Sequence, residues 1–219
     1  MAEAKRRTAV LISGRGSNLS ALIAASKAEN YPAEIAVVLA DNPDAAGLAH
    51  AREANIAAST VDRRSFGSKG EFEERIDNTL RRAGIELICL AGFMRLLSAG
   101  FVESWRDRVI NIHPSLLPLF PGLNTHARAL AAGVRVHGAS VHFVRAEVDA
   151  GPIIAQGVVP VLSNDTPARL AKRVLEVEHR IYPLALDLVA SGRARVVGDR
   201  VTIDGERGDP DATLLSPAS

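Results

Sequence analysis

The sequence has little of several features that mark large classes of proteins. It contains one cysteine, Cys89, which excludes a disulfide within the chain and is typical of a reducing compartment. Its 26 Lys and Arg residues nearly balance its 25 Asp and Glu residues, whereas nucleic-acid-binding proteins concentrate basic residues to neutralise phosphates. The first apolar run spans only residues 9–12, too short for a signal peptide or a membrane span. We therefore expect a cytoplasmic protein that binds neither nucleic acid nor membranes.

Two kinds of reactive site also lack their usual patterns. The histidines at 113, 126, 137 and 142 do not show the close spacing, such as H-x-x-x-H, that holds a metal ion. Ser115 and Ser140 lack the strand–turn–helix context that exposes a nucleophilic serine. The sequence therefore predicts neither a metal site nor a covalent serine intermediate.

What is present is a chain of 219 residues, 47% of them hydrophobic, which is long enough to bury a core without disulfides. No repeat or low-complexity tract divides it. We expect one domain over residues 1–205. Residues 206–219, rich in Asp, Pro, Ser and Gly, are expected to form a disordered tail.

Short apolar segments alternate with helical patterns through the first half of the chain. Strands are expected over 9–13, 35–40, 58–61, 87–91 and 109–113, with helices over 18–27, 47–54, 69–83 and 101–105. This alternation predicts an α/β fold, because strands in a parallel sheet are joined by right-handed crossovers at least one helix long. Strands that are apolar throughout favour a sheet covered by helices on both faces.

The pattern changes after residue 135. Segments 138–144 and 153–161 are separated only by a short turn region, so we expect an antiparallel hairpin that extends the sheet. Capping residues before Pro167 open a long helix, expected to reach about Ala190 and to bend near Pro183, which cannot donate to the helical ladder. The predicted fold is a Rossmann-like, mostly parallel sheet with a C-terminal hairpin extension.

A glycine-rich loop, residues 13–18 (SGRGSN), follows the first strand and opens the first helix. Its glycines allow a tight turn, and the start of a helix offers free N–H groups with the positive end of the helix dipole, which favours phosphate. The spacing is neither that of dinucleotide folds nor that of a Walker loop. A tight turn without a ligand explains the pattern about equally well.

The segment NIHPSLLP, residues 111–118, ends the fifth strand. Alternation along a strand places Asn111 and His113 on one face, and Pro114 keeps His113 extended. Ligands of open parallel sheets gather at the carboxyl ends of the strands, where this pair and the glycine-rich loop both lie. A lone strand histidine is more often structural, but an amide beside an imidazole can stabilise the oxyanion of an acyl transfer.

Asp149 precedes Ala-Gly-Pro in the turn region of the expected hairpin. Such a carboxylate is usually only a turn residue. It gains a chemical role if the hairpin folds back over the end of the fifth strand, because it could then pair with His113 and favour the protonated imidazole.

Five segments together resemble the folate-dependent phosphoribosylglycinamide formyltransferases of purine synthesis, over about residues 9–192: LISGRGSNL, LAGFMRLLS, NIHPSLLP, HGASVHFV with DAGPII, and VEHRIYP. NIHPSLLP alone also marks other enzymes that use 10-formyltetrahydrofolate. The resemblance implies the formyltransferase fold. It also implies transfer of a formyl group from 10-formyltetrahydrofolate, the co-substrate, to the amine of 5-phosphoribosylglycinamide by direct attack.

The resemblance also implies the roles of individual residues. The catalytic residues would be Asn111, His113 and Asp149. The ribonucleotide would be bound by Gly16, Ser17, Asn18, Gly92 and Glu178, with Asn18 capping the phosphate loop and Glu178 on the ribose. The folate would be bound by Lys69, Phe93, Met94, Arg95, Leu96, Leu97, Val102, Val144 and Asp149. Lys69 stands in place of an Arg of the family, and Leu175 lacks a cation that some members carry near the phosphate, for which Arg173 is the candidate substitute.

Several alternatives remain open at this stage. One is another 10-formyltetrahydrofolate enzyme, either a hydrolase or a transferase with a different acceptor. A second is a nucleotide-binding oxidoreductase, which needs an acidic residue at the end of the second strand; Asp41 is available. A third is a folate-binding module without catalysis. The expected partners are small-molecule substrates, and the oligomeric state, a homodimer included, stays open.

Overall fold

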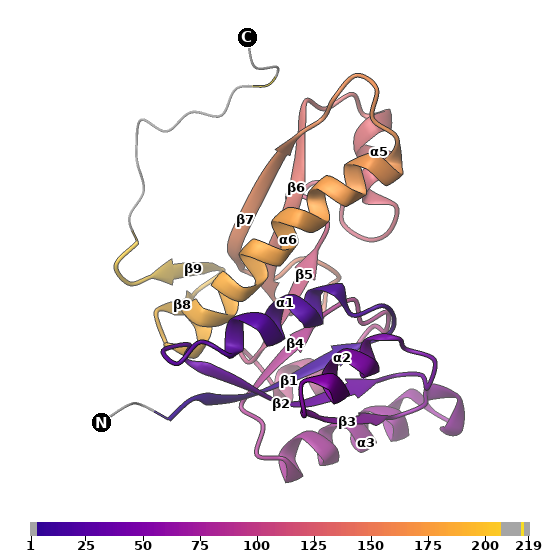
Figure 1. Ribbon diagram of the computed structural model, residues 1–219, viewed down its shortest axis with the longest axis vertical. Coiled ribbons are helices and arrows are strands. Elements are labelled where there is room, and N and C mark those ends of the chain that lie inside the picture. Colours follow the sequence, from indigo (N-terminus) through magenta and orange to yellow (C-terminus); the bar gives the residue numbers. More distant parts are fainter. Residues whose placement is uncertain (1–3, 207–215, 217–219) are drawn as a thin grey trace.

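The computed structural model describes residues 4–206 and residue 216 (Figure 1). The expected disordered tail lies outside the described residues except for Glu206 and Ser216. A seven-stranded sheet has the order β3-β2-β1-β4-β5-β6-β7. Five strands are parallel: β1 (Arg6–Ile12), β2 (Ala33–Ala40), β3 (Ala57–Thr60), β4 (Leu87–Leu90) and β5 (Val109–His113). The hairpin of β6 (Val136–Phe143) and β7 (Ile153–Pro160) extends the sheet in the antiparallel sense.

Helices cover both faces of the sheet. One face carries α1 (Ser17–Ser26), α2 (Gly47–Glu53), α5 (Thr125–Ala131) and α6 (Pro167–Ala190). The other face carries α3 (Lys69–Arg82) and α4 (Ala99–Ser104). Figure 1 shows α6 running along β6 and β7 with α1 beside it. None of the helices within residues 4–206 combines the length and apolar character that a membrane crossing requires.

The alternation of side chains along β1 explains why the sheet needs two covering layers. Val10 and Ile12 pack into the apolar cluster under α1 and α6, whereas Ala9 and Leu11 pack into the cluster under α3 and α4. All four side chains are fully buried. Period-two alternation therefore buries a strand that is apolar at every position, which confirms the predicted two-sided parallel sheet.

Three elements were not expected from the sequence. These are α5, a short 3₁₀ turn η1 (Arg63–Ser65), and a separate hairpin of β8 (Ala194–Val197) and β9 (Arg200–Ile203). Helix α5 begins after Asn124 in the left-handed conformation and buries only Thr125 and Ala129, so its sequence carries no continuous apolar stripe. Helix α6 continues through Pro183 to Ala190, and the bend near Pro183 stays a prediction.

The strand order brings the chemically interesting segments to one edge. Strands β1, β4 and β5 are neighbours, so the glycine-rich loop, Gly92 and His113 all lie where these strands end. The loop of residues 144–152, between β6 and β7, also reaches this edge. It carries Asp149, whose carboxylate contacts His113.

Candidate active site

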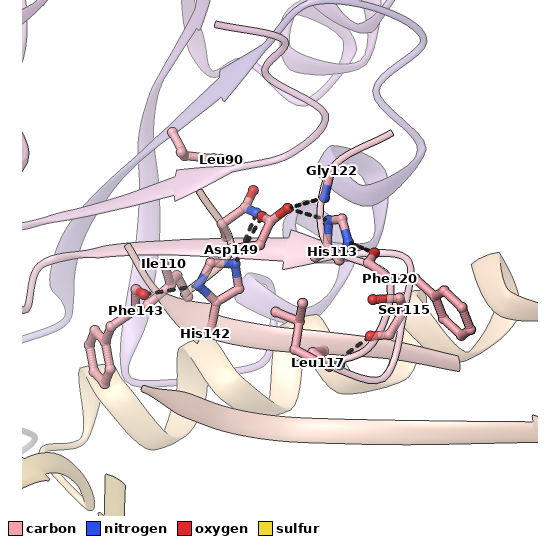
Figure 2. A network of polar contacts seen from close by, with 12 residues as sticks. Leu90, Ile110, His113, Ser115, Leu117, Phe120, Gly122, His142, Phe143 and Asp149 are labelled. Carbon is pink, nitrogen blue, oxygen red and sulfur yellow. Dashed lines mark hydrogen bonds and ion pairs between the residues drawn. The ribbon is translucent and has the colours of Figure 1, made fainter. Parts of the chain in front are cut away.

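Asn111, His113 and Asp149 meet at the carboxyl edge of the sheet, as Figure 2 shows for His113 and Asp149. The two β5 residues are placed on one face by the strand itself, with Ile112 pointing to the other. His113 is 6% exposed, and its Nδ1 lies 3.3 Å from Oδ2 of Asp149. The hairpin thus folds over β5 in the way that a chemical role for Asp149 requires.

Both ring nitrogens of His113 face acceptors. Nδ1 faces the carboxylate of Asp149, and Nε2 lies 3.0 Å from the carbonyl oxygen of Phe120. A neutral imidazole has only one N–H, so only the imidazolium donates to both partners. Nε2–H is therefore already engaged before any substrate binds.

Asp149 is held by several contacts at once. Its backbone lies at φ 54°, a conformation uncommon for residues other than glycine, and Oδ2 accepts a hydrogen bond from the N–H of Gly122 at 2.8 Å. Burial by itself raises the pKa of Asp149. The hydrogen bond from His142, the Gly122 N–H and the charges of His113 and His142 outweigh it, so the pKa of Asp149 lies below its ordinary value. The carboxylate is therefore ionised at neutral pH.

His142 is a further site residue that the sequence did not reveal. It lies on β6 directly opposite Asn111, and its Nε2 lies 3.2 Å from Nδ2 of Asn111 and 3.7 Å from Oδ1 of Asp149. Its Nδ1 donates to the carbonyl of Phe143 at 2.9 Å, so Nε2 is the nitrogen that faces the Asp149 carboxylate and the amide of Asn111. The second N–H of that amide stays available to a ligand. His142 could be recognised only from the pairing register of β5 with β6. That register is defined only in the folded hairpin.

Ser115 and Ser140 have structural roles. The hydroxyl of Ser115 donates to the carbonyl of Leu119 at 2.6 Å, and the hydroxyl of Ser140 donates to the carbonyl of Ser115 at 2.7 Å. Ser140 also accepts the N–H of Leu117 at 3.0 Å. These bonds fix the loop that places Phe120 and Gly122 against the catalytic candidates.

A cavity of about 370 Å³ opens beside Asn111, His142 and Asp149. This volume falls in the range of small-molecule sites. Its walls contain eight of the nine residues assigned to folate: Lys69, Phe93, Arg95, Leu96, Leu97, Val102, Val144 and Asp149. Met94 is the exception. Its side chain is 68% exposed, and its backbone N–H donates to the hydroxyl of Ser13 at 2.8 Å.

The glycine-rich loop leads directly into α1, and this start of the helix depends on the close approach of two glycines, Gly16 and Gly47. Gly16 lies at φ 77° as the N-cap of α1, and a Cβ there would stand 2.6 Å from Cα of Gly47. Ser17 and Asn18 form the first turn, where backbone N–H groups lack helical partners. Gly92, at φ 71°, has open space around it and accepts the N–H of Ser13 through its carbonyl at 3.2 Å.

The expected cap at Asn18 is wrong. No side chain caps α1; instead Nδ2 of Asn18 donates to Oε2 of Glu178 at 2.6 Å. Glu178 is 8% exposed, and its burial raises its pKa although the Asn18 bond opposes this. The other amide atom, Oδ1 of Asn18, is buried without a partner among the described residues. A helix far along the chain thus supplies a carboxylate beside the loop.

Arg173 does not neutralise a phosphate at this loop. Its guanidinium pairs with both oxygens of Asp165 at 2.9 Å and donates to the carbonyl of Pro160 at 2.7 Å. The side chain of Asp165 is 1% exposed, and the paired guanidinium lowers its pKa to about 2. Arg173 is therefore committed to holding the start of α6 against the end of β7. Among the described residues no group of three His, Cys, Asp or Glu side chains is placed to hold a metal ion.

Comparison with known proteins gives consistent matches. A family model described as formyl transferase matches residues 6–186. The phosphoribosylglycinamide formyltransferase of Escherichia coli (strain K12) is 42% identical over 201 residues, which cover 92% of this chain and 95% of that protein. The trifunctional purine biosynthetic protein adenosine-3 of Gallus gallus is 50% identical over 192 residues, or 88% of this chain and 19% of that protein. The chain thus spans about a fifth of the trifunctional relative.

A solved structure agrees with these sequence matches. Glycinamide ribonucleotide transformylase 1 from Symbiobacterium toebii superposes with a TM-score of 0.88 at 46% identity, covering 91% of this chain and 94% of that one. The matched family segment contains the glycine-rich loop, β5 and the loop that carries Asp149.

Proposed function

The chain belongs to the formyl transferase family, and from this we propose that it transfers the formyl group of 10-formyltetrahydrofolate to the amine of 5-phosphoribosylglycinamide in purine biosynthesis. One observation carries the proposal: Asn111 and Asp149 line one cavity together with seven further residues assigned to folate. The names of the Escherichia coli and Symbiobacterium toebii relatives support the choice of acceptor. We place the reaction in the cytoplasm, with which the single buried thiol of Cys89 agrees.

The reaction begins when the neutral amine attacks the formyl carbon and the carbonyl oxygen becomes an oxyanion. The free N–H of Asn111 and Nε2–H of His113 donate to this oxygen. Because Nε2–H already binds the carbonyl of Phe120, it must turn from that oxygen to the substrate or be shared between them. Asp149 stabilises the imidazolium that makes this second donor possible.

The remaining steps move protons and break the bond to the folate. The attacking nitrogen loses a proton to the ionised carboxylate of Asp149, directly or through a water molecule. The tetrahedral intermediate then collapses, the bond between the formyl carbon and N10 breaks, and N10 takes up a proton. The products are formylated glycinamide ribonucleotide and tetrahydrofolate. No covalent bond to the enzyme is needed, and alignment of the two substrates supplies much of the acceleration.

The ribonucleotide fits the region between α1 and α6. Its phosphate would lie on the N–H groups of Ser17 and Asn18, at the positive end of the α1 dipole. Glu178, which already accepts from Asn18, would accept from the ribose hydroxyls. The buried, unpartnered Oδ1 of Asn18 supplies a further acceptor for a hydroxyl of the ligand.

The alternatives predict different activities. A hydrolase of the same co-substrate would release formate without an acceptor, and a transferase with another acceptor would ignore the ribonucleotide. An oxidoreductase would need Asp41 on a ribose, but that carboxylate is buried and bound to Nε of Arg95 at 2.5 Å. This contact argues against the oxidoreductase.

The test mixes purified protein with 10-formyltetrahydrofolate and follows deformylation with and without 5-phosphoribosylglycinamide. We expect deformylation to depend on the ribonucleotide and to survive exhaustive chelation. Formate release without the acceptor would favour the hydrolase. Loss of activity in EDTA with recovery on adding zinc would contradict the metal-free reaction.

A further inference from the structure

Asp41 follows β2 as a buried carboxylate that the proposed chemistry does not use. Its side chain is 1% exposed, and a carboxylate removed from water is strongly destabilising unless partners satisfy it. Oδ2 accepts a hydrogen bond from Nε of Arg95 at 2.5 Å, and Oδ1 accepts one from Nδ2 of Asn42 at 3.2 Å. Asp41 is therefore a fixed anchor for one arginine at the carboxyl edge of the sheet.

The side chain of Arg95 has few other constraints on its direction. It lies in the segment 93–98, which is neither helix nor strand, and its neighbours Met94 and Leu96 are 68% and 69% exposed. The Arg95 side chain itself is 44% exposed. Phe93 and Leu97 pack against the apolar cluster under α3 and α4 and so hold the backbone on both sides of Arg95. The Arg95 side chain itself has, among the described residues, only the hydrogen bond to Asp41, so this ion pair decides where the guanidinium points.

Arg95 also lines the cavity assigned to folate. Its Nε donates to Asp41, and within residues 4–206 its two terminal nitrogens donate no hydrogen bond. The planar fork of an arginine binds a carboxylate through two parallel N–H groups, and such binding depends on orientation. An arginine anchored at Nε presents the remaining N–H groups in one direction.

The spacing of the strands suits an elongated ligand. Asn111 lies on β5 and Asp41 follows β2, three strands away, which corresponds to roughly 14 Å. In a folate, a benzoyl ring and an amide bond separate the reactive N10 from the carboxylates of the glutamyl group. A folate with its formyl group at Asn111 therefore directs its anionic end away from the catalytic residues and towards Arg95.

We propose that Asp41 is a positioning residue for recognition of the glutamyl group, acting through Arg95. The buried carboxylate holds Nε of Arg95, and the terminal nitrogens of Arg95 bind a carboxylate of the folate tail. This inference rests on the proposed use of a folate and adds a residue outside the cavity that sets selectivity for its tail. Asp41 touches neither the folate nor the reacting atoms.

The test compares two ligands that differ only in the tail: tetrahydrofolate and tetrahydropteroate, which lacks the glutamyl group. Asp41→Asn keeps the shape of the side chain and an acceptor for Arg95 but removes the charge. By calorimetry we expect tetrahydrofolate to bind about tenfold more weakly and tetrahydropteroate to bind as in the wild type. A purely structural role of Asp41 would weaken both ligands equally, and that result would overturn the inference.

Two further variants separate charge from position. Asp44→Asn removes an exposed carboxylate from the same turn and should leave both affinities unchanged. Arg95→Lys keeps a cation for Asp41 but loses the fork, so it should reproduce the selective loss of tetrahydrofolate binding. Adding Asp41→Asn to Arg95→Lys should cost less than twofold more. A full tenfold further loss in the double variant would show that Asp41 does not act through Arg95.

The wild-type protein distinguishes this inference from the proposed function. If it binds tetrahydrofolate better than tetrahydropteroate but transfers no formyl group to the ribonucleotide, the proposed function fails and the assignment of Asp41 stands. If it transfers the formyl group but binds the two ligands equally, the assignment fails and the proposed function stands. Binding of neither ligand would overturn both.

Discussion

Asp149 combines a left-handed backbone, two histidine contacts and a backbone hydrogen bond in one residue. A non-glycine residue keeps such a conformation only where its surroundings impose it. The contacts from His113, His142 and Gly122 are all made to the carboxylate. They therefore fix the position of the negative charge and not only that of the backbone. This arrangement suits a group that must accept a proton at a fixed point.

Asp149→Asn should therefore act on the transition state. The amide is nearly isosteric, so the fold and both substrate affinities should survive, but it cannot accept the amine proton or favour the imidazolium of His113. We expect kcat to fall about 10²–10⁴-fold with KM little changed. Steady-state kinetics with each substrate varied in turn would measure this.

The double variant tests whether the two residues work together. His113→Ala should reduce kcat much less in the Asp149→Asn background than in the wild type, because residues that act as a unit are not additive. If the two effects multiply instead, Asp149 and His113 do not serve the same step, and the mechanism is wrong.

Asn18 and Glu178 form a second pair at this scale, joined by a 2.6 Å hydrogen bond. Asn18→Ala and Glu178→Ala should each weaken ribonucleotide binding about ten- to a hundredfold, the effect of losing one charge-assisted hydrogen bond, and leave folate binding unchanged. Calorimetry with each ligand checks this. An equal fall in folate affinity would contradict the assignment of the pair to the ribonucleotide site.

The loop between β1 and α1 shows how one element depends on another. Gly16 lies at φ 77° against Gly47, so a side chain at Gly16 would be strained and would also collide with the backbone of α2. Gly14, two residues earlier, has nothing within 4 Å of an added Cβ. The same loop therefore offers a sensitive glycine and a tolerant one.

Gly16→Ala should lower the free energy of unfolding by about 1–3 kcal/mol and weaken ribonucleotide binding, because the start of α1 must shift. Gly14→Ala should change stability far less. Urea denaturation of both variants gives the comparison. Equal stability losses would show that the contact between Gly16 and Gly47 does not limit the loop.

Some helices and strands could be predicted from the sequence, and others could not. The βα units were predictable because their buried strands are apolar at every position, as in Leu87–Leu90, and the hairpin was predictable from its short connection. Helix α5 and the hairpin of β8 and β9 bury too few side chains to show a pattern. Their positions depend on tertiary packing.

The same division applies to the candidate site. Asn111 and His113 could be found from one strand, because alternation alone places them together. His142 depends on the register between β5 and β6, and the bond of Asp41 to Arg95 joins residues 54 apart in the chain. Neither of these contacts can be predicted from the local sequence. The resemblance to a family supplied Glu178, which no local pattern would have linked to the glycine-rich loop.

At the scale of the whole molecule, buried histidines make stability depend on pH. His137 is 1% exposed, and its ring packs edge-on against His126 and Phe120. Burial first, and then the charge of His126, lower the pKa of His137 to about 4 from an ordinary value near 6.5. Burial also lowers the pKa of His126 and of His179.

The sign of the pH effect follows from these shifts. Between about pH 6.5 and pH 4 the unfolded chain binds a proton at His137 that the folded chain does not bind, so stability falls as the pH falls through this window. The lowered pKa of Asp149 adds a loss in the same direction at still lower pH. The raised pKa of Glu178 acts in the opposite direction and offsets part of the loss.

His137→Phe should therefore flatten the dependence of stability on pH. Neither ring nitrogen of His137 has a hydrogen-bond partner among the described residues, so a phenyl ring can replace the imidazole with little loss of bonding. The fall of the His137 pKa from near 6.5 to about 4 corresponds to about 3 kcal/mol of stability that the wild type loses on acidification and the variant keeps. Urea denaturation from pH 7.5 to pH 4.5 measures the difference, and most of that loss should be resolved within this range.

Asp44→Asn, which changes an exposed carboxylate, should follow the wild-type curve. Parallel curves for His137→Phe and the wild type would mean that the fold loses its acid stability elsewhere.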